Sequence, residues 1–277
     1  MTLATRRRGE TIRSHNATPS ATWSSGGGAY DEVSRGILDA IEHCIERLDP
    51  PRGGHVLDVA TGTGWAARRM AARGCTVTGV DFAPDMLGAA EEMAAARNLD
   101  IAFDLGDAEA LPYPDAAFDA VFSSFGIMFV QRPEDAAAEL ARVCKPGGRI
   151  ALATWTPEGN VFEMFRIMKA YMPQQPAGTP PPSPFDWGRE ARLTELLGDH
   201  FDLAFERGTS FYREPDGQSA WRTFVEGYGP LRTLAGKLDA ADARSLEREF
   251  VAFHDGFATD LGVCVPREYL VAAGTRR

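Results

Sequence analysis

Two stretches of the chain, each an apolar segment that runs into a polar end, constrain the fold most strongly. Residues 55–64 read His-Val-Leu-Asp-Val-Ala-Thr-Gly-Thr-Gly, an apolar strand that breaks into a glycine-rich turn. Residues 77–81 read Val-Thr-Gly-Val-Asp, a second apolar strand that ends on a carboxylate. The Ala- and Arg-rich segment between them, Trp65–Arg73, is a predicted helix. Together the three segments predict a βαβ unit with a nucleotide site at its strand ends.

The turn and the terminal carboxylate indicate what such a site would hold. Gly62 and Gly64 let the backbone approach a ligand that a Cβ atom would push away. The N-terminus of the following helix offers free N–H donors and a partial positive charge. Asp81 is placed where a carboxylate can accept hydrogen bonds from both hydroxyls of a ribose. The unit therefore predicts an adenosine-containing cofactor.

Composition narrows the class of protein. The 277 residues are 44% hydrophobic and 25% charged, as in ordinary globular proteins, and the formal net charge of −10 makes nucleic acid a poor partner. The four cysteines lie far apart, without the spacing of a metal site or a disulfide framework, so we expect no metal and reduced thiols in a cytoplasmic protein. No apolar run approaches the roughly 20 residues that span a bilayer, so we expect no integral membrane association.

Strand and helix signals alternate along the first 155 residues. The predicted strands are 55–60, 75–81, 101–105, 118–124 and 149–155, and the predicted helices are 31–48, 65–73, 84–97 and 133–144. Five strands that alternate with helices predict an α/β fold with a doubly wound, mostly parallel sheet.

The pattern changes after Trp155. A helix is expected at 160–172, a proline-rich loop at 173–188, strands at 201–211 and 269–275, and a largely helical stretch at 217–261. The proline loop is either a surface connection or a rim over the pocket. The expected organisation is a disordered polar tail (1–22), a cofactor-binding α/β core (23–155) and a region (156–277) that adds strands and a mainly helical cap over the acceptor.

The glycine turn alone does not identify the cofactor. Residues 62–67 fit the G-x-G-x-x-A fingerprint of dinucleotide sites, which is weak alone. Residues 106–112, Gly-Asp-Ala-Glu-Ala-Leu-Pro, place Asp107 at the end of the third strand, where it can accept a hydrogen bond from the adenine amine. A dinucleotide site would need room for a pyrophosphate there, and no Tyr-x-x-x-Lys pair occurs. An NAD(P)-dependent oxidoreductase or epimerase remains the alternative.

With these motifs in order, the chain resembles the class I S-adenosylmethionine (SAM)-dependent methyltransferases. It is most similar to the small-molecule branch that includes the ubiquinone/menaquinone-biosynthesis type (methyltransferase type 11). Ala60 stands where many members have glycine. The resemblance covers about Tyr30–Trp155 and is vague beyond. The matching segments are 56–64, 80–86, 106–112, 118–119 and 140–148.

The resemblance implies SAM as cofactor, with S-adenosylhomocysteine as product, and it implies roles for individual residues. Asp58 would orient the turn, the Ala108 N–H would donate to an adenine ring nitrogen, and the Ser123 carbonyl would accept from the methionine ammonium. Tyr30 would close over the methionine end. The implied cofactor residues are Tyr30, Asp58, Ala60, Thr61, Gly62, Gly64, Asp81, Phe82, Met86, Asp107, Ala108 and Ser123.

Methyl transfer from a sulfonium is an in-line displacement, for which the protein mainly positions the reactants and excludes water. The segment 123–129, Ser-Ser-Phe-Gly-Ile-Met-Phe, is apolar where amino-group nucleic-acid methyltransferases carry a polar-Pro-Pro-aromatic motif. It favours a small, apolar or aromatic acceptor. No catalytic residue is evident, and His254 and Tyr228 are the candidates for a general base. A SAM-binding scaffold without catalysis is a further alternative. The residues expected to line the acceptor pocket are Phe125, Phe129, Trp187 and Tyr228.

Overall fold

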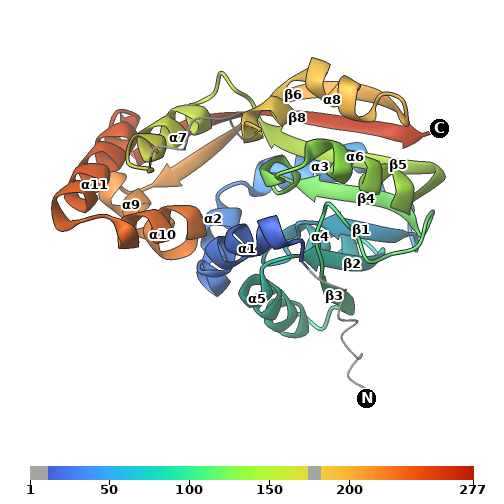
Figure 1. Ribbon diagram of the computed structural model, residues 1–277. Coiled ribbons are helices and arrows are strands. Elements are labelled where there is room, and N and C mark those ends of the chain that lie inside the picture. The colour runs from blue at the N-terminus through green and yellow to red at the C-terminus, as the bar shows by residue number, and fades with distance from the viewer. Residues whose placement is uncertain (1–11, 174–181) are drawn as a thin grey trace.

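The computed structural model describes residues 12–173 and 182–277 of the chain. Its centre is one sheet in the order β3-β2-β1-β4-β5-β8-β6, with the short β7 paired to β8 (Figure 1). Strands β1 to β5 pair in parallel, and β8 runs antiparallel to both β5 and β6. The predicted doubly wound, mostly parallel α/β fold is confirmed. The strands are β1 (His55–Val59), β2 (Thr76–Asp81), β3 (Ile101–Leu105), β4 (Phe118–Ser124), β5 (Cys144–Trp155), β6 (Phe201–Glu214), β7 (Ala258–Thr259) and β8 (Gly262–Arg276).

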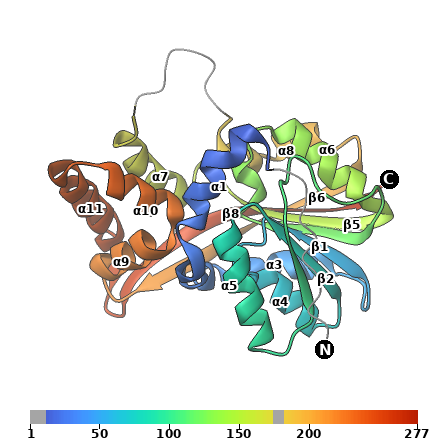
Figure 2. The same cartoon turned by 60° about the horizontal axis from the view of Figure 1, so that its bottom comes forward.

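Helices cover both faces of the sheet (Figure 2). On one face lie α3 (Leu38–Leu48), α4 (Trp65–Ala72) and α5 (Pro84–Ala95), and on the other lie α6 (Pro133–Val143) and α8 (Glu190–Leu197). Four consecutive residues of β1 are buried, because a strand in the middle of a two-sided parallel sheet faces apolar side chains in both directions. The strand order reverses between β1 and β4, which opens a crevice outside the carboxyl ends of these strands.

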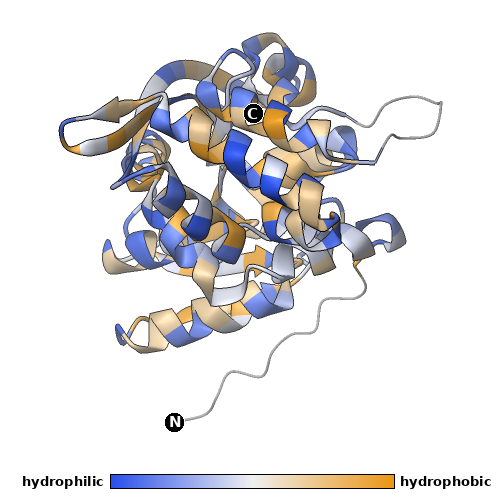
Figure 3. Ribbon diagram, turned by 90° about the vertical axis from the view of Figure 1, so that its left-hand side faces the viewer, coloured by the Kyte–Doolittle hydropathy of each residue, from blue (hydrophilic) through white to orange (hydrophobic). Residues whose placement is uncertain are grey.

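The carboxyl-terminal part of the chain forms a second region beside this crevice. The β6–β8 ladder continues well past the rest of the sheet, and its far end is covered by helices that lie at the left in Figures 1 and 2. These helices show mixed hydrophobic and hydrophilic residues along their length (Figure 3), as expected for helices with one buried face. They are α7 (Asn160–Ala170), α9 (Gly217–Gly227), α10 (Gly229–Lys237) and α11 (Ala240–Asp255).

Two predicted strands are too short, because the sequence pattern fades where the long hairpin leaves the sheet. Strand β8 begins seven residues before the expected 269, and β6 continues to Glu214. The first half of β8 alternates buried and half-buried residues but contains Pro266 and two charged residues, a composition typical of a loop. Pairing with β6 turns it into a strand. The stretch 217–261 is largely helical, as predicted, with three helices followed by the two-residue β7.

The amino-terminal prediction is also corrected. Residues 12–22, expected to belong to a disordered tail, include a short 3₁₀ helix (Ser14–Asn16) and most of α1 (Ala17–Ser24), while 1–11 lie outside the described residues. The single helix expected at 31–48 is two, α2 (Tyr30–Arg35) and α3. The break falls at Gly36, where an added Cβ would lie 2.9 Å from the Tyr212 ring.

The proline-rich loop is only partly covered by the structure, because 174–181 lie outside the described residues. Pro184–Gly188 forms a 3₁₀ turn, and Phe185 packs edge-on against Phe162 and Phe165. The end of this loop is therefore anchored in the core. Across the described ranges, every helix is too short or too polar to cross a membrane.

Candidate cofactor and acceptor site

A pocket lies at the carboxyl ends of β1, β2, β3 and β4 and encloses about 890 Å³, including space open to solvent. Its floor is formed by the residues that follow these four strands, as the strand order requires. The helices α1 and α2 contribute side chains from the opposite side. The predicted cofactor residues that line this pocket are Tyr30, Ala60, Thr61, Gly62, Asp81, Phe82, Met86, Asp107 and Ala108.

The glycine turn after β1 is held open by its backbone conformation. Ala60 has φ 55° and Gly62 has φ 56°, both in the left-handed region. An alanine costs more than a glycine in this region. Phe125, across the pocket after β4, is a second non-glycine residue with positive φ, at 58°. Strained backbone of this kind is typical of ligand sites.

Asp81 ties the turn to the end of β2. Its two carboxylate oxygens accept the backbone N–H groups of Gly62 at 2.8 Å and Ala83 at 2.9 Å. Burial raises its pKa to about 6, although both hydrogen bonds favour the ionised form. Each oxygen keeps a lone pair, and the residue lines the pocket. The carboxylate is thus fixed in position and can accept two further hydrogen bonds from a ligand.

Three predicted cofactor residues, Asp58, Gly64 and Ser123, do not line the pocket but support it. Asp58 is buried and accepts the Thr61 hydroxyl at 2.6 Å, and burial raises its pKa to about 7. A Cβ at Gly64 would lie 3.1 Å from both the Ala90 and the Phe103 side chains, so this glycine permits helix–strand packing.

The third of these residues joins two strands. The Ser123 hydroxyl donates to the Val59 carbonyl at 2.7 Å and accepts the Ile127 N–H at 3.2 Å. It therefore links β4 to β1 at the point where the strand order reverses. The neighbouring Ser124 faces the pocket instead.

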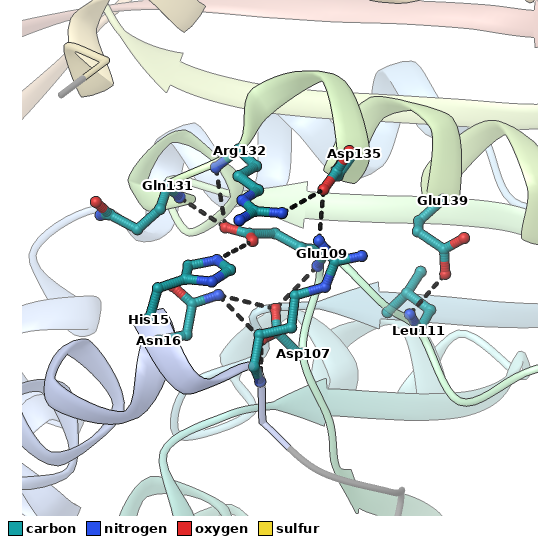
Figure 4. Close-up of polar contacts among 10 residues, drawn as sticks. His15, Asn16, Asp107, Glu109, Leu111, Gln131, Arg132, Asp135 and Glu139 are labelled. Carbon is teal, nitrogen blue, oxygen red and sulfur yellow. Dashed lines mark hydrogen bonds and ion pairs between the residues drawn. The ribbon is translucent and has the colours of Figure 1, made fainter. Parts of the chain in front are cut away.

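The amino-terminal segment binds the loop that follows β3, beside the pocket (Figure 4). Asn16 is buried and lines the pocket, and its Nδ2 donates to both Asp107 oxygens, at 3.2 and 3.0 Å. The backbone N–H of Arg13 donates to the same carboxylate, as does that of Glu109, at 3.0 Å each. Sequence reasoning missed Asn16, because nothing in the polar segment around it indicates burial.

A second carboxylate beside Asp107 secures the same segment. Glu109 is almost fully buried, and one of its oxygens accepts the N–H groups of Gln131 and Arg132, which precede α6. Its other oxygen lies 2.6 Å from His15 Nε2 (Figure 4). The loop after β3 therefore binds both the start of α6 and the amino-terminal segment.

Tyr30 covers the glycine turn from the opposite side. The Asp31 carboxylate next to it accepts from the Thr63 hydroxyl at 3.0 Å and from the Arg68 guanidinium at 2.9 Å, which docks α2 on the turn. The Tyr30 ring lies 3.4 Å from the position of a Cβ on Gly62. Burial, together with the nearby Asp81, raises the pKa of Tyr30 to about 12. Its hydroxyl is therefore protonated at neutral pH.

Part of the pocket is aromatic, but only some of the residues predicted to line an acceptor pocket reach it. Phe125 and Phe129 line the pocket, together with Trp23. Trp187 is buried beside β5, where its carbonyl accepts the hydroxyl of Thr154, and it does not line the pocket.

Tyr228 lies directly behind this aromatic lining. Its ring packs edge-on against Trp23, with 5.3 Å between ring centroids, and against Phe165 at 6.2 Å. Its hydroxyl is buried without a hydrogen-bond partner among the described residues. Burial raises its pKa well above the usual value, which disfavours a role as a base.

His254, the other candidate base, lies outside the pocket lining in α11. Its Nδ1 donates to the Phe250 carbonyl at 2.8 Å, so in the neutral ring Nε2 carries the lone pair. Burial lowers its pKa to about 4. The ring packs among Phe224, Phe250 and Phe253.

Comparison with known proteins agrees with this arrangement. Residues 57–152 match the family model described as a methyltransferase domain. An uncharacterised protein of Mycobacterium tuberculosis is 36% identical over 229 residues, which cover 81% of this chain and 82% of that protein. The demethylmenaquinone methyltransferase of Thermus thermophilus is 47% identical over 120 residues, 43% of this chain and 53% of that enzyme.

Solved structures share the fold. The YcgJ protein of Bacillus subtilis superposes with a TM-score of 0.58 at 19% identity, over 87% of this chain and 99% of that protein. One family assignment agrees with the fold, the glycine turn, the strand-end carboxylates and the match to the family model. The chain belongs to the class I SAM-dependent methyltransferases.

Proposed function

We propose that this enzyme binds SAM in the pocket at the ends of β1–β4 and transfers its methyl group to a small, largely apolar or aromatic acceptor. The observation that carries the proposal is the continuity of the pocket. Its carboxylate-rich half, around Asp81 and Asp107, opens directly into an aromatic half formed by Trp23, Phe125 and Phe129. A nucleoside fits the first half and an apolar methyl acceptor fits the second.

In the cofactor half, each group has a complementary partner. Asp81 accepts the two ribose hydroxyls, and the apolar side chains of Phe82 and Met86 flank the adenine. Asp107 already accepts from Asn16, Arg13 and Glu109, so its main role is to hold the amino-terminal segment over the base. The adenine amine shares this carboxylate.

In the acceptor half, the residues position the acceptor and exclude water. In-line displacement needs the acceptor atom aligned behind the methyl group, which aromatic walls achieve without a charged catalytic residue. The neutral hydroxyl of Tyr30 and the side chains of Ser34 and Ser124 are among the polar groups that line the pocket. Any proton lost by the acceptor can pass to solvent after transfer.

Calorimetry with S-adenosylhomocysteine tests the cofactor assignment. Wild-type protein should bind it, and NADH and NADPH should not compete. Asp81→Ala should bind roughly 30- to 1000-fold more weakly, because two hydrogen bonds to a charged acceptor are lost. Asp85→Ala removes an exposed carboxylate in the first turn of α5 and should leave affinity unchanged.

Two outcomes would contradict the proposal. Unchanged affinity in Asp81→Ala would refute the ribose assignment. Tight cofactor binding without transfer of labelled methyl to any member of a broad panel of apolar and aromatic acceptors would favour a catalytically silent scaffold.

A further inference from the structure

One wall of the pocket is a line of side chains from α2 and the start of α3. Tyr30, Ser34, Ile37 and Ile41 all line the pocket, at spacings of three or four residues. Side chains at such spacings lie on one side of a helical segment. The line continues past Gly36, where α2 ends. This α2–α3 wall therefore changes from hydroxyl groups to branched apolar side chains along its length.

The polar end of the α2–α3 wall lies at the cofactor half of the pocket. The Tyr30 ring is 3.4 Å from the position of a Cβ on Gly62, in the glycine turn that follows β1. Ile41, at the apolar end, belongs to α3, which packs against β4 and β5. These strands lie on the opposite side of β1 from β2 and β3, whose ends carry the nucleoside-binding carboxylates of the proposed function. The wall thus becomes apolar as it leads away from the nucleoside position.

Tyr30 presents a hydrogen-bond donor to the pocket. Burial and the nearby Asp81 raise the pKa of its hydroxyl to about 12, and an interaction with the Ser34 hydroxyl opposes this rise. A hydroxyl lowers the pKa of a phenol by donating a hydrogen bond to its oxygen. With Ser34 as the donor, the Tyr30 proton is left for a ligand. Tyr30 can therefore donate to an oxygen atom of an acceptor, and its raised pKa keeps the proton on the phenol at neutral pH.

The charges of the pocket disfavour an ionised acceptor. Among the described residues, the charged side chains of the pocket lining are the carboxylates of Asp81 and Asp107. They repel an anion, which would also give up its hydration without gaining a counter-charge. A cation would need one of these carboxylates, but Asp81 is assigned to the ribose and Asp107 already holds the amino-terminal segment. An uncharged acceptor meets neither cost.

We infer that the methyl acceptor is an uncharged aromatic or apolar molecule with a carbonyl or hydroxyl oxygen, which accepts a hydrogen bond from Tyr30 while the apolar part extends along the apolar end of the α2–α3 wall. Ser34 is a positioning residue, since it acts on the acceptor through Tyr30. Phe125 supplies apolar contact from the end of β4, where it stacks on Trp155 with 3.9 Å between ring centroids. This inference rests on the proposed function and adds to it the charge, the polar group and the orientation of the acceptor.

Four probes that share one shape test this inference: acetophenone, its oxygen-free counterpart α-methylstyrene, the anion benzoate and the cation benzamidinium. Their dissociation constants are measured at neutral pH by ligand-detected NMR titration of the full chain saturated with S-adenosylhomocysteine. Acetophenone should bind at least ~10-fold more tightly than either ion, because burial of an unpaired charge costs more than one hydrogen bond returns.

Tyr30→Phe removes the donor and keeps the ring. In this variant the ratio of the acetophenone and α-methylstyrene dissociation constants should shift by roughly 2- to 12-fold against acetophenone, the effect of one hydrogen bond. Ser34→Ala should shift the ratio in the same direction by less. Tyr171→Phe is the matched control and should leave the ratio unchanged, because the Tyr171 hydroxyl donates to Glu249 at 2.6 Å in an exposed contact.

Calorimetry with S-adenosylhomocysteine separates this role from cofactor binding, since Tyr30→Phe should keep the wild-type affinity for it. The inference would be overturned by an unchanged probe ratio in Tyr30→Phe, by an ion that binds as tightly as acetophenone, or by no binding of acetophenone. A loss of S-adenosylhomocysteine affinity in Tyr30→Phe in place of a shifted ratio would overturn it too. Failure of the wild type to bind S-adenosylhomocysteine would instead overturn the proposed function. If Tyr30→Phe does not fold, Ser34→Ala and the wild-type comparison of the probes decide.

Discussion

Single residues at the strand ends of this enzyme have features that cost stability but prepare the pocket for a ligand. Asp81 is buried enough to raise its pKa to about 6, yet it is held by two backbone N–H donors and faces the pocket. Ala60 and Phe125 keep left-handed backbone conformations that cost stability. Each of these features destabilises the free protein slightly and prepares a surface for a ligand.

The raised pKa of Asp81 predicts a pH dependence of cofactor binding. Ribose hydroxyls donate to the ionised carboxylate, so binding of S-adenosylhomocysteine should be strong above about pH 6 and should weaken as the pH falls through that value. Calorimetry from about pH 5 to 8 measures this, and the profile of Asp81→Asn should be flat because its side chain does not titrate. A wild-type affinity that stays constant down to about pH 5 would contradict the assignment.

Asp58 predicts a pH dependence of stability. Its folded pKa of about 7 lies above its unfolded value of 3.8, so the group stabilises the fold fully at pH below 3.8, and this contribution is lost as the pH rises towards about 7. Asp58→Asn keeps an acceptor for Thr61 but cannot ionise. Its melting temperature relative to wild type should therefore rise between about pH 5 and 8, whereas Asp100→Asn, on the surface, should show no such trend.

At the scale of elements, the amino-terminal segment is the part of the site that is least evident from local pattern. The 3₁₀ helix Ser14–Asn16 and α1 have no strong apolar face, and α1 is held by contacts to α5 and α10. Ser20 donates to the Phe82 carbonyl at 2.6 Å, and the Ser24 hydroxyl accepts the Asp85 N–H at 3.0 Å. The segment thus completes the pocket through polar contacts.

Asn16→Ala tests this role. The variant loses the side-chain hydrogen bonds to Asp107 and should bind S-adenosylhomocysteine roughly 5- to 30-fold more weakly, as expected when a buried charged acceptor loses a partner. Thr18→Ala, an exposed position on α1, should bind like wild type in the same titration. Equal affinities for Asn16→Ala and Thr18→Ala would exclude the segment from the cofactor site.

At the scale of the whole molecule, the two ends of one sheet form two structurally different parts. The parallel part presents the crevice between β1 and β4, and the long β6–β8 ladder extends to the helices α7, α9 and α11 (Figure 1). The aromatic residues Trp23, Phe129, Phe165 and Tyr228 join the two parts. Acceptor selection is expected where these parts meet.

Hydrogen exchange followed by mass spectrometry should map this division. S-adenosylhomocysteine should slow hydrogen exchange in residues 13–24, 30–35 and 59–62. The reason is that it binds and stabilises only the state in which the amino-terminal segment is packed over the pocket. The peptide that contains β7 and the start of β8, far along the ladder, should exchange at an unchanged rate. Uniform slowing across all of these peptides would indicate global stabilisation rather than packing of the amino-terminal segment over the pocket.

The sequence by itself determined the elements and side chains whose signals are local. Apolar runs with a glycine turn and a terminal carboxylate placed β1, β2 and Asp81, because backbone conformation and strand burial depend on neighbours within a few residues. The parallel order then followed from alternating strands and helices, and it brought Ala60, Asp81 and Asp107 to one edge.

Only the tertiary structure decided which distant side chains meet. Asn16 reaches Asp107 across 91 positions of sequence, and Arg267 meets the α9 helix through a hairpin that local pattern had ended too early. Trp187 and His254 became core residues although their types suggested a site. Such contacts depend on how helices and strands pack. The role of a buried polar group is therefore known only once the packing shows which hydrogen-bond partners it has.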